Sequence, residues 1–296
     1  MRYTTLISAD QLKALRTSGA PLMVFDCSFD LANPAAGEEQ YRKAHLPGAV
    51  YAHLDTALSD QGVVEPDGSH HPHPDAASGG RHPLPSREKF AMWLCSVGFS
   101  NEMQAVVYDR QNANYCGRLW WMLKWAGHDA VAILDGGVQA WQAAGGEVTD
   151  QAEPSHFQSN FTLGEPLVRL VSTQEVEQGL GQRAHTIVDA RAPQRFRGEV
   201  EPLDPVAGHI PGALNRPFAQ NLGPDGRFKP PAQLRAEFEQ LLVGRDPASV
   251  VHHCGSGVSA VPNVVAMELA GLGRTGLYAG SWSEWCRDPS RPVERG

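Results

Sequence analysis

Short apolar runs alternate along the chain with longer segments in which apolar residues recur at helical spacing. Val24-Phe25-Asp26 and Ile187-Val188-Asp189 are typical of buried strands that end in a carboxylate. Residues 118–125 and 233–242 show the helical pattern. Because strands alternate with helices, the sequence predicts an α/β fold in which mainly parallel sheets are flanked by helices.

The pattern occurs twice. His45-Leu46-Pro47-Gly48-Ala49 returns as His209-Ile210-Pro211-Gly212-Ala213, and we interpret both motifs as structural turns. Such internal repetition indicates duplicated structural units. Residues 145–166 are polar and lack sustained periodicity. We therefore predict two tandem α/β domains, residues 1–150 and 166–296, which are joined by a linker at residues 151–165.

Composition limits the classes of partner. The chain of 296 residues is long enough for two domains, and 42% hydrophobic with 20% charged residues is typical of a globular protein. A net charge of −8 without a block of Lys or Arg argues against nucleic acid or an anionic membrane as partner. The sequence has no apolar stretch near 18 residues. Five scattered cysteines without CxxC spacing predict neither a disulfide framework nor a zinc site, so a reducing cytoplasm is the expected location.

The most informative segment is Cys254-Gly255-Ser256-Gly257-Val258-Ser259, which lies between an apolar run and a helix-like stretch. Its glycines permit a tight turn, in which successive N–H groups and the helix N-terminus can converge on one anion. A thiol held there is expected to act as a nucleophile, although a buried, inert cysteine is the alternative. A cysteine phosphatase would need an arginine at Ala260, so phosphate fits poorly.

This loop resembles the active-site loop of the rhodanese superfamily, and within it the loop of the mercaptopyruvate sulfurtransferases. Their usual loop ends in threonine, and Ser259 keeps the hydroxyl. The tandem repeat is similar to their two-domain architecture. The resemblance implies sulfur transfer from 3-mercaptopyruvate, through a persulfide on Cys254, to a thiol, cyanide or protein acceptor. It implies no metal or organic cofactor, and it allows a thioredoxin-like reductant as partner.

The resemblance also assigns roles to individual residues. Ser256, His82 and Asp55 match a Ser-His-Asp relay, in which the aspartate orients the imidazole and the histidine exchanges a proton near the sulfur. Arg195 matches an arginine that binds the donor carboxylate, for which a guanidinium fork is suited. The other loop residues are expected to contact the substrate: Gly255, Gly257, Val258 and Ser259.

The first half of the chain departs from the second in two ways. Asp109 stands where the second half has Cys254, so the first half offers no nucleophile. The distance from His45 to Asp109 is 64 positions, whereas His209 to Cys254 is 45. The first domain therefore contains an additional segment.

The additional positions lie in a segment rich in His, Pro and Gly, at about 60–85. Long loops of this kind are usually functional or disordered, and we expect this one to reach the Cys254 loop and supply His82. Closely spaced histidines in a proline-rich loop lack a fixed ligand geometry. We expect the following three to form a solvated surface and not a metal site: His70, His71 and His73.

The family's second carboxylate-binding arginine is missing at its expected place, which is Leu203 in this chain. The identity of the donor is therefore open. A thiosulfate-using rhodanese is one alternative, although its typical loop carries basic residues that are absent here. A sulfur carrier or protein-interaction module without small-molecule turnover is the alternative from another class.

Overall fold

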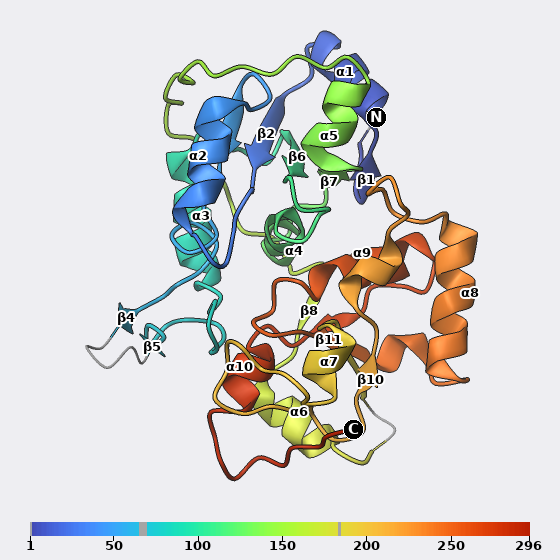
Figure 1. The fold of residues 1–296 in the computed structure, drawn as a ribbon. Helices are drawn as coiled ribbons and strands as arrows, with labels where there is room; N and C mark the ends of the chain where they lie inside the picture. Colours follow the sequence, from blue (N-terminus) through green and yellow to red (C-terminus); the bar gives the residue numbers. More distant parts are fainter. Residues whose placement is uncertain (1, 65–69, 183–184) are drawn as a thin grey trace. The chain divides into compact units, whose positions relative to one another are not determined.

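A computed structural model describes residues 2–64, 70–182 and 185–296. By their contacts they form two compact units (Figure 1). Unit 1 comprises Met1–Ser59, Pro85–Leu167 and Pro224–Arg227, and unit 2 comprises Asp60–Leu84, Val168–Gly223 and Phe228–Gly296. The segment 60–84, which the sequence assigns to the first domain, thus has its contacts in unit 2. Among the described residues, no helix combines the length and apolarity of a membrane span.

Unit 1 is built on a parallel sheet with the strand order β1-β7-β6-β2-β3. Its central strands are apolar and almost wholly buried, as expected for parallel strands covered on both faces. The strands are β1 (Leu6–Ile7), β2 (Leu22–Asp26), β3 (Ala49–Tyr51), β6 (Gln104–Tyr108) and β7 (Val131–Leu134). The helices are α1 (Ala9–Thr17), α2 (Ala35–Lys43), α3 (Arg87–Ser96), α4 (Cys116–Trp125) and α5 (Gly137–Ala143).

Unit 2 repeats this sheet strand for strand, in the order β8-β12-β11-β9-β10 and again parallel. The predicted fold of two α/β domains with mainly parallel sheets is therefore confirmed. The strands are β8 (Arg169–Leu170), β9 (Thr186–Asp189), β10 (Leu214–Asn215), β11 (Val250–His253) and β12 (Gly276–Leu277). The helices are α6 (Thr173–Gly179), α7 (Pro193–Phe196), α8 (Pro231–Leu242), α9 (Val261–Leu269) and α10 (Ser281–Trp285).

The His/Pro/Gly-rich segment contains a short antiparallel pair, β4 (Val63–Val64) with β5 (His70–His71), which the sequence pattern did not predict. Residues 65–69 lie outside the described residues, and so do the side chains of His70 and His71, so their predicted solvation stays a prediction. His73 is half-exposed and pairs with Asp75.

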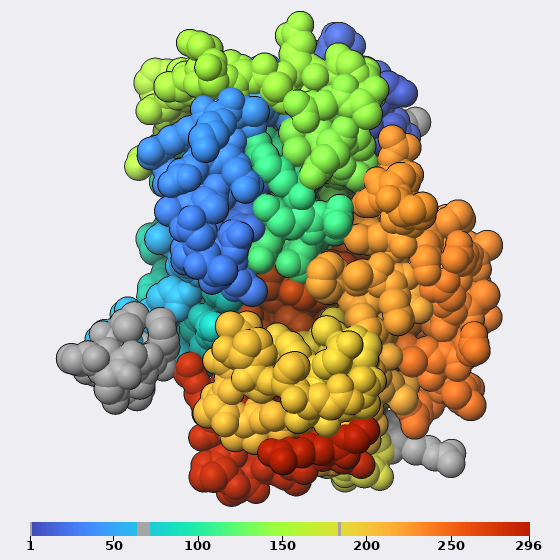
Figure 2. Space-filling model, in the orientation of Figure 1, coloured from blue at the N-terminus to red at the C-terminus, as the bar shows by residue number. Residues whose placement is uncertain are grey.

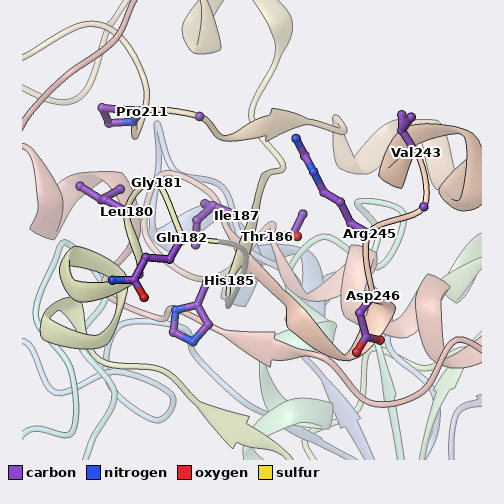
Figure 3. Close-up of a pocket in the computed structure, with 13 residues that line it drawn as sticks. Leu180, Gly181, Gln182, His185, Thr186, Ile187, Pro211, Val243, Arg245 and Asp246 are labelled. Atoms are coloured by element: carbon purple, nitrogen blue, oxygen red, sulfur yellow. The ribbon is translucent and has the colours of Figure 1, made fainter.

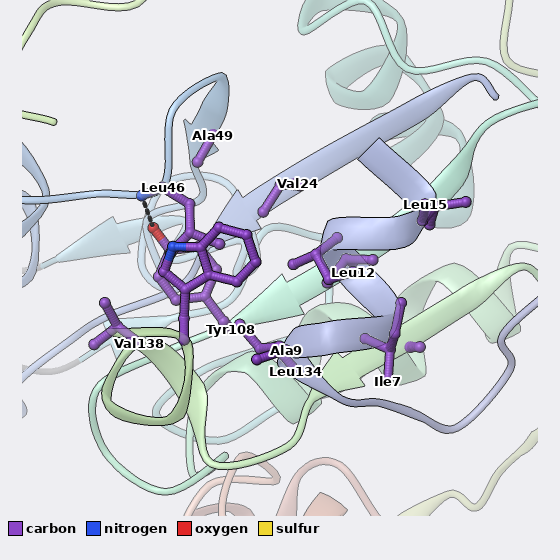
Figure 4. Packing of buried hydrophobic residues seen from close by; sticks show 13 residues of the cluster. Ile7, Ala9, Leu12, Leu15, Val24, Leu46, Ala49, Tyr108, Leu134 and Val138 are labelled. Carbon is purple, nitrogen blue, oxygen red and sulfur yellow. Dashed lines mark hydrogen bonds between the residues drawn. The ribbon is translucent and has the colours of Figure 1, made fainter. Parts of the chain in front are cut away.

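The core of unit 1 joins the first His-x-Pro-Gly turn to the sheet (Figure 4). Apolar side chains of α1, β2 and β7 pack around Tyr108, which is fully buried at the end of β6. The Tyr108 hydroxyl accepts a hydrogen bond of 3.1 Å from the Leu46 N–H. The buried phenol therefore satisfies a backbone donor of the turn.

A glutamate closes this turn. Gly48 adopts φ +77°, which favours glycine, and its N–H donates to Glu153 Oε1 at 2.6 Å. The same oxygen lies 3.2 Å from His45 Nε2, while His45 Nδ1 lies 2.7 Å from the Tyr41 carbonyl oxygen. His45 thus links the end of α2 to Glu153, which lies 108 positions later in the chain.

The second turn has the same arrangement. His209 stacks on Phe196 with ring centroids 3.7 Å apart, and the Gly212 N–H donates to Glu294 Oε2 at 2.8 Å. His209 and Glu294 also form an antiparallel backbone bridge. Figure 2 shows the C-terminal segment in red against the yellow residues near position 200. Both motifs are therefore structural turns, as the sequence analysis interprets them.

We predict that Glu153→Gln lowers the free energy of unfolding by about 1 kcal/mol or more, because hydrogen bonds to a charged acceptor are stronger than neutral ones. Urea denaturation of the full chain measures this loss. Asp150→Asn is the control, since Asp150 is exposed in the same segment and its side chain contacts only its neighbour Gln151 among the described residues. Equal stability of the Glu153 and Asp150 variants would contradict the role of the glutamate.

Candidate active site

The Cys254 loop connects β11 to α9 and is almost wholly buried, with Cys254 only 2% exposed. Gly257 adopts φ +75°. A Cβ placed on Gly257 would lie 2.1 Å from the Ala279 carbonyl oxygen. Glycine is therefore required there, both for its left-handed conformation and for the close approach of backbone.

The first turn of α10 holds this loop. The Cys254 N–H donates to Ser281 Oγ at 3.1 Å, and the Cys254 carbonyl accepts the Trp282 N–H at 3.0 Å. The Gly255 carbonyl accepts the Ser283 N–H at 2.8 Å. Ser281 is buried and adopts φ +57°, a strained conformation for a residue with a side chain. Ser281 was not among the residues predicted from the sequence, and the repeat has Gly137 at the matching position.

Two members of the predicted relay lie side by side. His82 Nδ1 is 2.7 Å from Ser256 Oγ, and both side chains are buried. The backbone next to His82 is fixed, because the Arg81 N–H donates to Ser283 Oγ at 2.9 Å. This arrangement allows a proton to pass between imidazole and hydroxyl beside the Cys254 loop.

Asp55, the third member of the predicted relay, belongs to unit 1. It is partly buried, and its backbone N–H donates to His53 Nδ1 at 3.1 Å. Its action on His82 stays a prediction.

Arg195 lies at the end of α7 and is held by two acidic side chains. Its Nη2 is 2.6 Å from Glu201 Oε1 and 3.3 Å from Asp204 Oδ2. Arg191, by contrast, is buried and pairs with Asp189 at 2.7 Å, which agrees with a structural ion pair. Of the two arginines, Arg195 keeps partial exposure and can contact a substrate.

A further arginine, Arg81, lies beside the same loop and was not among the residues predicted from the sequence. Its Nη1 is 2.6 Å from Asp204 Oδ1. A Cβ placed on Gly255 would lie 3.1 Å from Arg81 Nη2 and 3.5 Å from Arg195 Nη1. Burial raises the pKa of Asp204, and the two arginines act against this rise. The apolar side chain of Leu203 is 47% exposed, and its backbone N–H donates to Glu201 Oε1 at 3.1 Å.

The cysteines differ in environment, although all five are free. Burial raises the pKa of Cys27 and of Cys116 well above the ordinary range, and that of Cys286 to about 11. Thiols that stay protonated are poor nucleophiles. Cys254 is the cysteine that stands at the start of a glycine-bearing loop.

The matching loop of unit 1 shows what such a loop binds. Asp109 replaces the cysteine, and each of its two carboxylate oxygens accepts two backbone N–H groups of its own loop. The four donors, at 2.8–2.9 Å, are Gln111, Ala113, Tyr115 and Cys116. Burial raises the pKa of the Asp109 carboxyl, and these hydrogen bonds oppose the rise. The loop geometry of this fold thus cradles an anion at its first residue.

Comparison with known proteins agrees with this geometry. A model of the rhodanese-like domain matches residues 8–144 and again 172–288. The chain belongs to the rhodanese family. A Pseudomonas aeruginosa protein named as a probable 3-mercaptopyruvate sulfurtransferase is 44% identical, over the full length of both chains. The SseB protein of Mycobacterium tuberculosis, which bears a thiosulfate sulfurtransferase name, is 39% identical over 100% of this chain and 98% of its own.

A solved structure supports the same family. The 3-mercaptopyruvate sulfurtransferase from Leishmania major is 30% identical, with a TM-score of 0.78, covering 97% of this chain and 76% of its own. The prediction of a two-domain sulfurtransferase of the rhodanese family, an enzyme, is confirmed by these relatives. Their names imply a small-molecule sulfur donor and an acceptor.

Two other features of unit 2 do not involve the rhodanese loop. A cavity of about 680 Å³ is lined by residues that include Leu180, His185 and Arg245 (Figure 3), and none of the predicted site residues lines it. Among the described residues, one group could offer ligand atoms to a metal ion: Asp60, His73 and Asp75. Two of these three side chains are exposed. That the histidines of this segment do not form a metal site stays a prediction.

We predict that Ser281→Ala lowers the free energy of unfolding by about 1–3 kcal/mol, because the buried Cys254 N–H loses its acceptor. Ser281→Gly loses the same acceptor but relieves the backbone strain, so its free energy of unfolding should fall less than that of Ser281→Ala. Urea denaturation of both variants tests this order. An alanine variant as stable as the wild type would contradict the assigned contact.

Proposed function

We propose that this rhodanese-family sulfurtransferase takes sulfur from 3-mercaptopyruvate onto Cys254. The observation that carries the proposal is the 2.7 Å contact between His82 and Ser256, two residues after the cysteine. A buried nucleophile at a glycine-bearing turn and an adjacent proton-transfer pair are the two components that the reaction needs. The name of the Pseudomonas aeruginosa relative supports the choice of donor.

In the proposed first step, the Cys254 thiolate attacks the sulfur of the donor and forms an S–S bond. The donor's C–S bond breaks, and its electron pair stays on carbon as the enolate of pyruvate. The donor's thiol proton is transferred to that carbon, so that pyruvate leaves and an anionic persulfide remains. His82 and Ser256 move this proton, and Asp55 orients the imidazole. Arg195 binds the carboxylate.

The remaining loop residues hold the persulfide. Its negative charge is stabilised by backbone N–H groups of the loop, as the Asp109 carboxylate is in unit 1. The proposed contacts come from Gly255, Gly257, Val258 and Ser259. A thiol, cyanide or protein acceptor then removes the outer sulfur, which gives ping-pong kinetics. A thioredoxin-like dithiol fits as reductant, and five free cysteines fit a reducing compartment such as the cytoplasm.

Thiosulfate is the second candidate donor. Two guanidinium groups beside Gly255 would attract a dianion, and the Mycobacterium tuberculosis relative bears a thiosulfate sulfurtransferase name. Parallel turnover assays with 3-mercaptopyruvate and thiosulfate decide between the two donors. If loaded Cys254 passes its sulfur only to a cognate protein, the chain is a sulfur carrier.

We predict that Cys254 alone carries the sulfur. After incubation with 3-mercaptopyruvate, intact mass analysis should show one added sulfur atom on the wild type and none on Cys254→Ser. Cys116→Ser is the matched control, since burial beside Asp109 raises the pKa of that thiol. Sulfur found on Cys116 or Cys286 would overturn the assignment.

We predict that His82→Ala slows loading of Cys254 by about 10²- to 10⁴-fold, which is the usual contribution of a positioned acid or base. Asp55→Ala should act in the same direction, because it leaves the imidazole unoriented. Single-turnover loading, followed by mass analysis, measures both rates, and circular dichroism checks the fold. Wild-type loading in both variants would exclude the relay.

A further inference from the structure

Ser283, in the first turn of α10, contacts both segments that supply the proton-transfer pair. Its backbone N–H donates to the Gly255 carbonyl at 2.8 Å, and so holds the nucleophile loop. Its side-chain Oγ accepts the Arg81 N–H at 2.9 Å, and so holds the residue before His82. We propose that Ser283 is a positioning residue for sulfur transfer, which keeps His82 against Ser256. The inference rests on the proposed function for the role of this pair.

His82 lies on a small closed loop, residues 77–84. The Ala77 N–H donates to the Leu84 carbonyl at 2.8 Å, and the Leu84 N–H donates to Ser78 Oγ at 2.9 Å. Leu84 is fully buried, so the base of the loop is fixed. A contact at the tip of such a short, closed loop therefore also constrains the position of the imidazole.

Gly80 allows the tip of this loop to lie directly against α10. It is buried and adopts φ +88°. A Cβ on Gly80 would lie 2.5 Å from the Gly280 carbonyl oxygen and 2.8 Å from Ser283 Oγ. A side chain at this position would push the loop away from Ser283, so glycine is required for the contact.

The hydroxyl of Ser283 is oriented for its contact with the loop. The residue is 1% exposed, and its Oγ donates to the Gly280 carbonyl oxygen at 3.3 Å. Because its one proton is used there, an oxygen lone pair is left to accept the Arg81 N–H. Removing the hydroxyl would leave that N–H without this acceptor.

The matching residue of unit 1 uses its side chain differently. Gln139 stands at the position of Ser283 and is exposed. Its Nε2 donates to the carbonyl of Arg110, at 2.9 Å, and Arg110 is the residue that follows Asp109. In unit 2 the corresponding carbonyl, that of Gly255, is bound by the Ser283 backbone instead. The Ser283 hydroxyl is thus left for the segment that the repeat does not share.

A double-mutant cycle tests the assignment, with single-turnover loading of Cys254 from 3-mercaptopyruvate as the rate. Ser283→Ala should slow loading about tenfold, because the imidazole is no longer held at Ser256. Ser283→Thr keeps the hydroxyl and should restore part of the rate. In the His82→Ala background, Ser283→Ala should cause no further loss, since it acts through the imidazole. An equal loss in both backgrounds, or no loss in either, would overturn the inference.

Two further variants separate positioning from folding. Ser249→Ala is the matched control and should load at the wild-type rate, because the Ser249 hydroxyl contacts Thr186 at the opposite end of β11. Gly80→Ala keeps the Ser283 hydroxyl but displaces the loop, so it should reproduce the defect of Ser283→Ala. Alkylation of Cys254 by iodoacetamide does not need the donor's proton, and its rate should be unchanged in Ser283→Ala. A parallel fall of both rates would mean that Ser283 acts on the nucleophile, which also contradicts the inference.

Amide hydrogen exchange tests the contact without any sulfur donor. Ser283→Ala should speed exchange of the Arg81 N–H, and Ser249→Ala should leave it unchanged. Wild-type exchange of Arg81 in Ser283→Ala would show that the hydroxyl does not hold the loop. If the wild type fails to load Cys254 from 3-mercaptopyruvate, the proposed function fails, and the exchange rate still decides whether Ser283 positions the His82 loop.

Discussion

The backbone hydrogen bonds between the Cys254 loop and the first turn of α10 are the constraint on which the site depends. They fix the N–H and C=O of Cys254, and with them the direction of its side chain. The loop can approach the backbone of Ala279, just before α10, because Gly257 has no Cβ. The same turn also holds the backbone of Arg81 through Ser283. The nucleophile loop and the backbone beside His82 are thus both held by the start of one helix.

The two halves of the chain show how one loop geometry serves two purposes. In unit 1 the N–H groups bind the carboxylate of Asp109, and the loop is a closed structural element. In unit 2 the shorter side chain of Cys254 stands at the same position, so the loop N–H groups are available to an anion carried on that sulfur. The repeated strands and His-x-Pro-Gly turns build both loops. The difference in chemistry comes from one side chain and from the neighbours that segment 60–84 adds.

Local patterns of the sequence were enough to predict the α/β fold, the repeat and the loop of the nucleophile, because strands, glycine turns and helix starts have short-range signals. The contact between His82 and Ser256 was expected only from the family resemblance, since it joins residues 174 positions apart. Arg81 and Ser281 were missed for a related reason. Their roles depend on tertiary contacts, with Asp204 and with the Cys254 N–H, that no periodicity encodes.

The permanently bound carboxylate of Asp109 has a thermodynamic consequence. Unit 1 carries its anion as part of the chain, so the stability of its loop does not vary during turnover. In the proposed cycle, unit 2 carries a persulfide anion only while sulfur is on Cys254, and hydrogen bonds that the loop gives this anion in the folded state alone stabilise that state. Because the sulfur is covalently attached, this gain does not depend on ligand concentration. The melting temperature of the second half would then report how much of the enzyme is loaded.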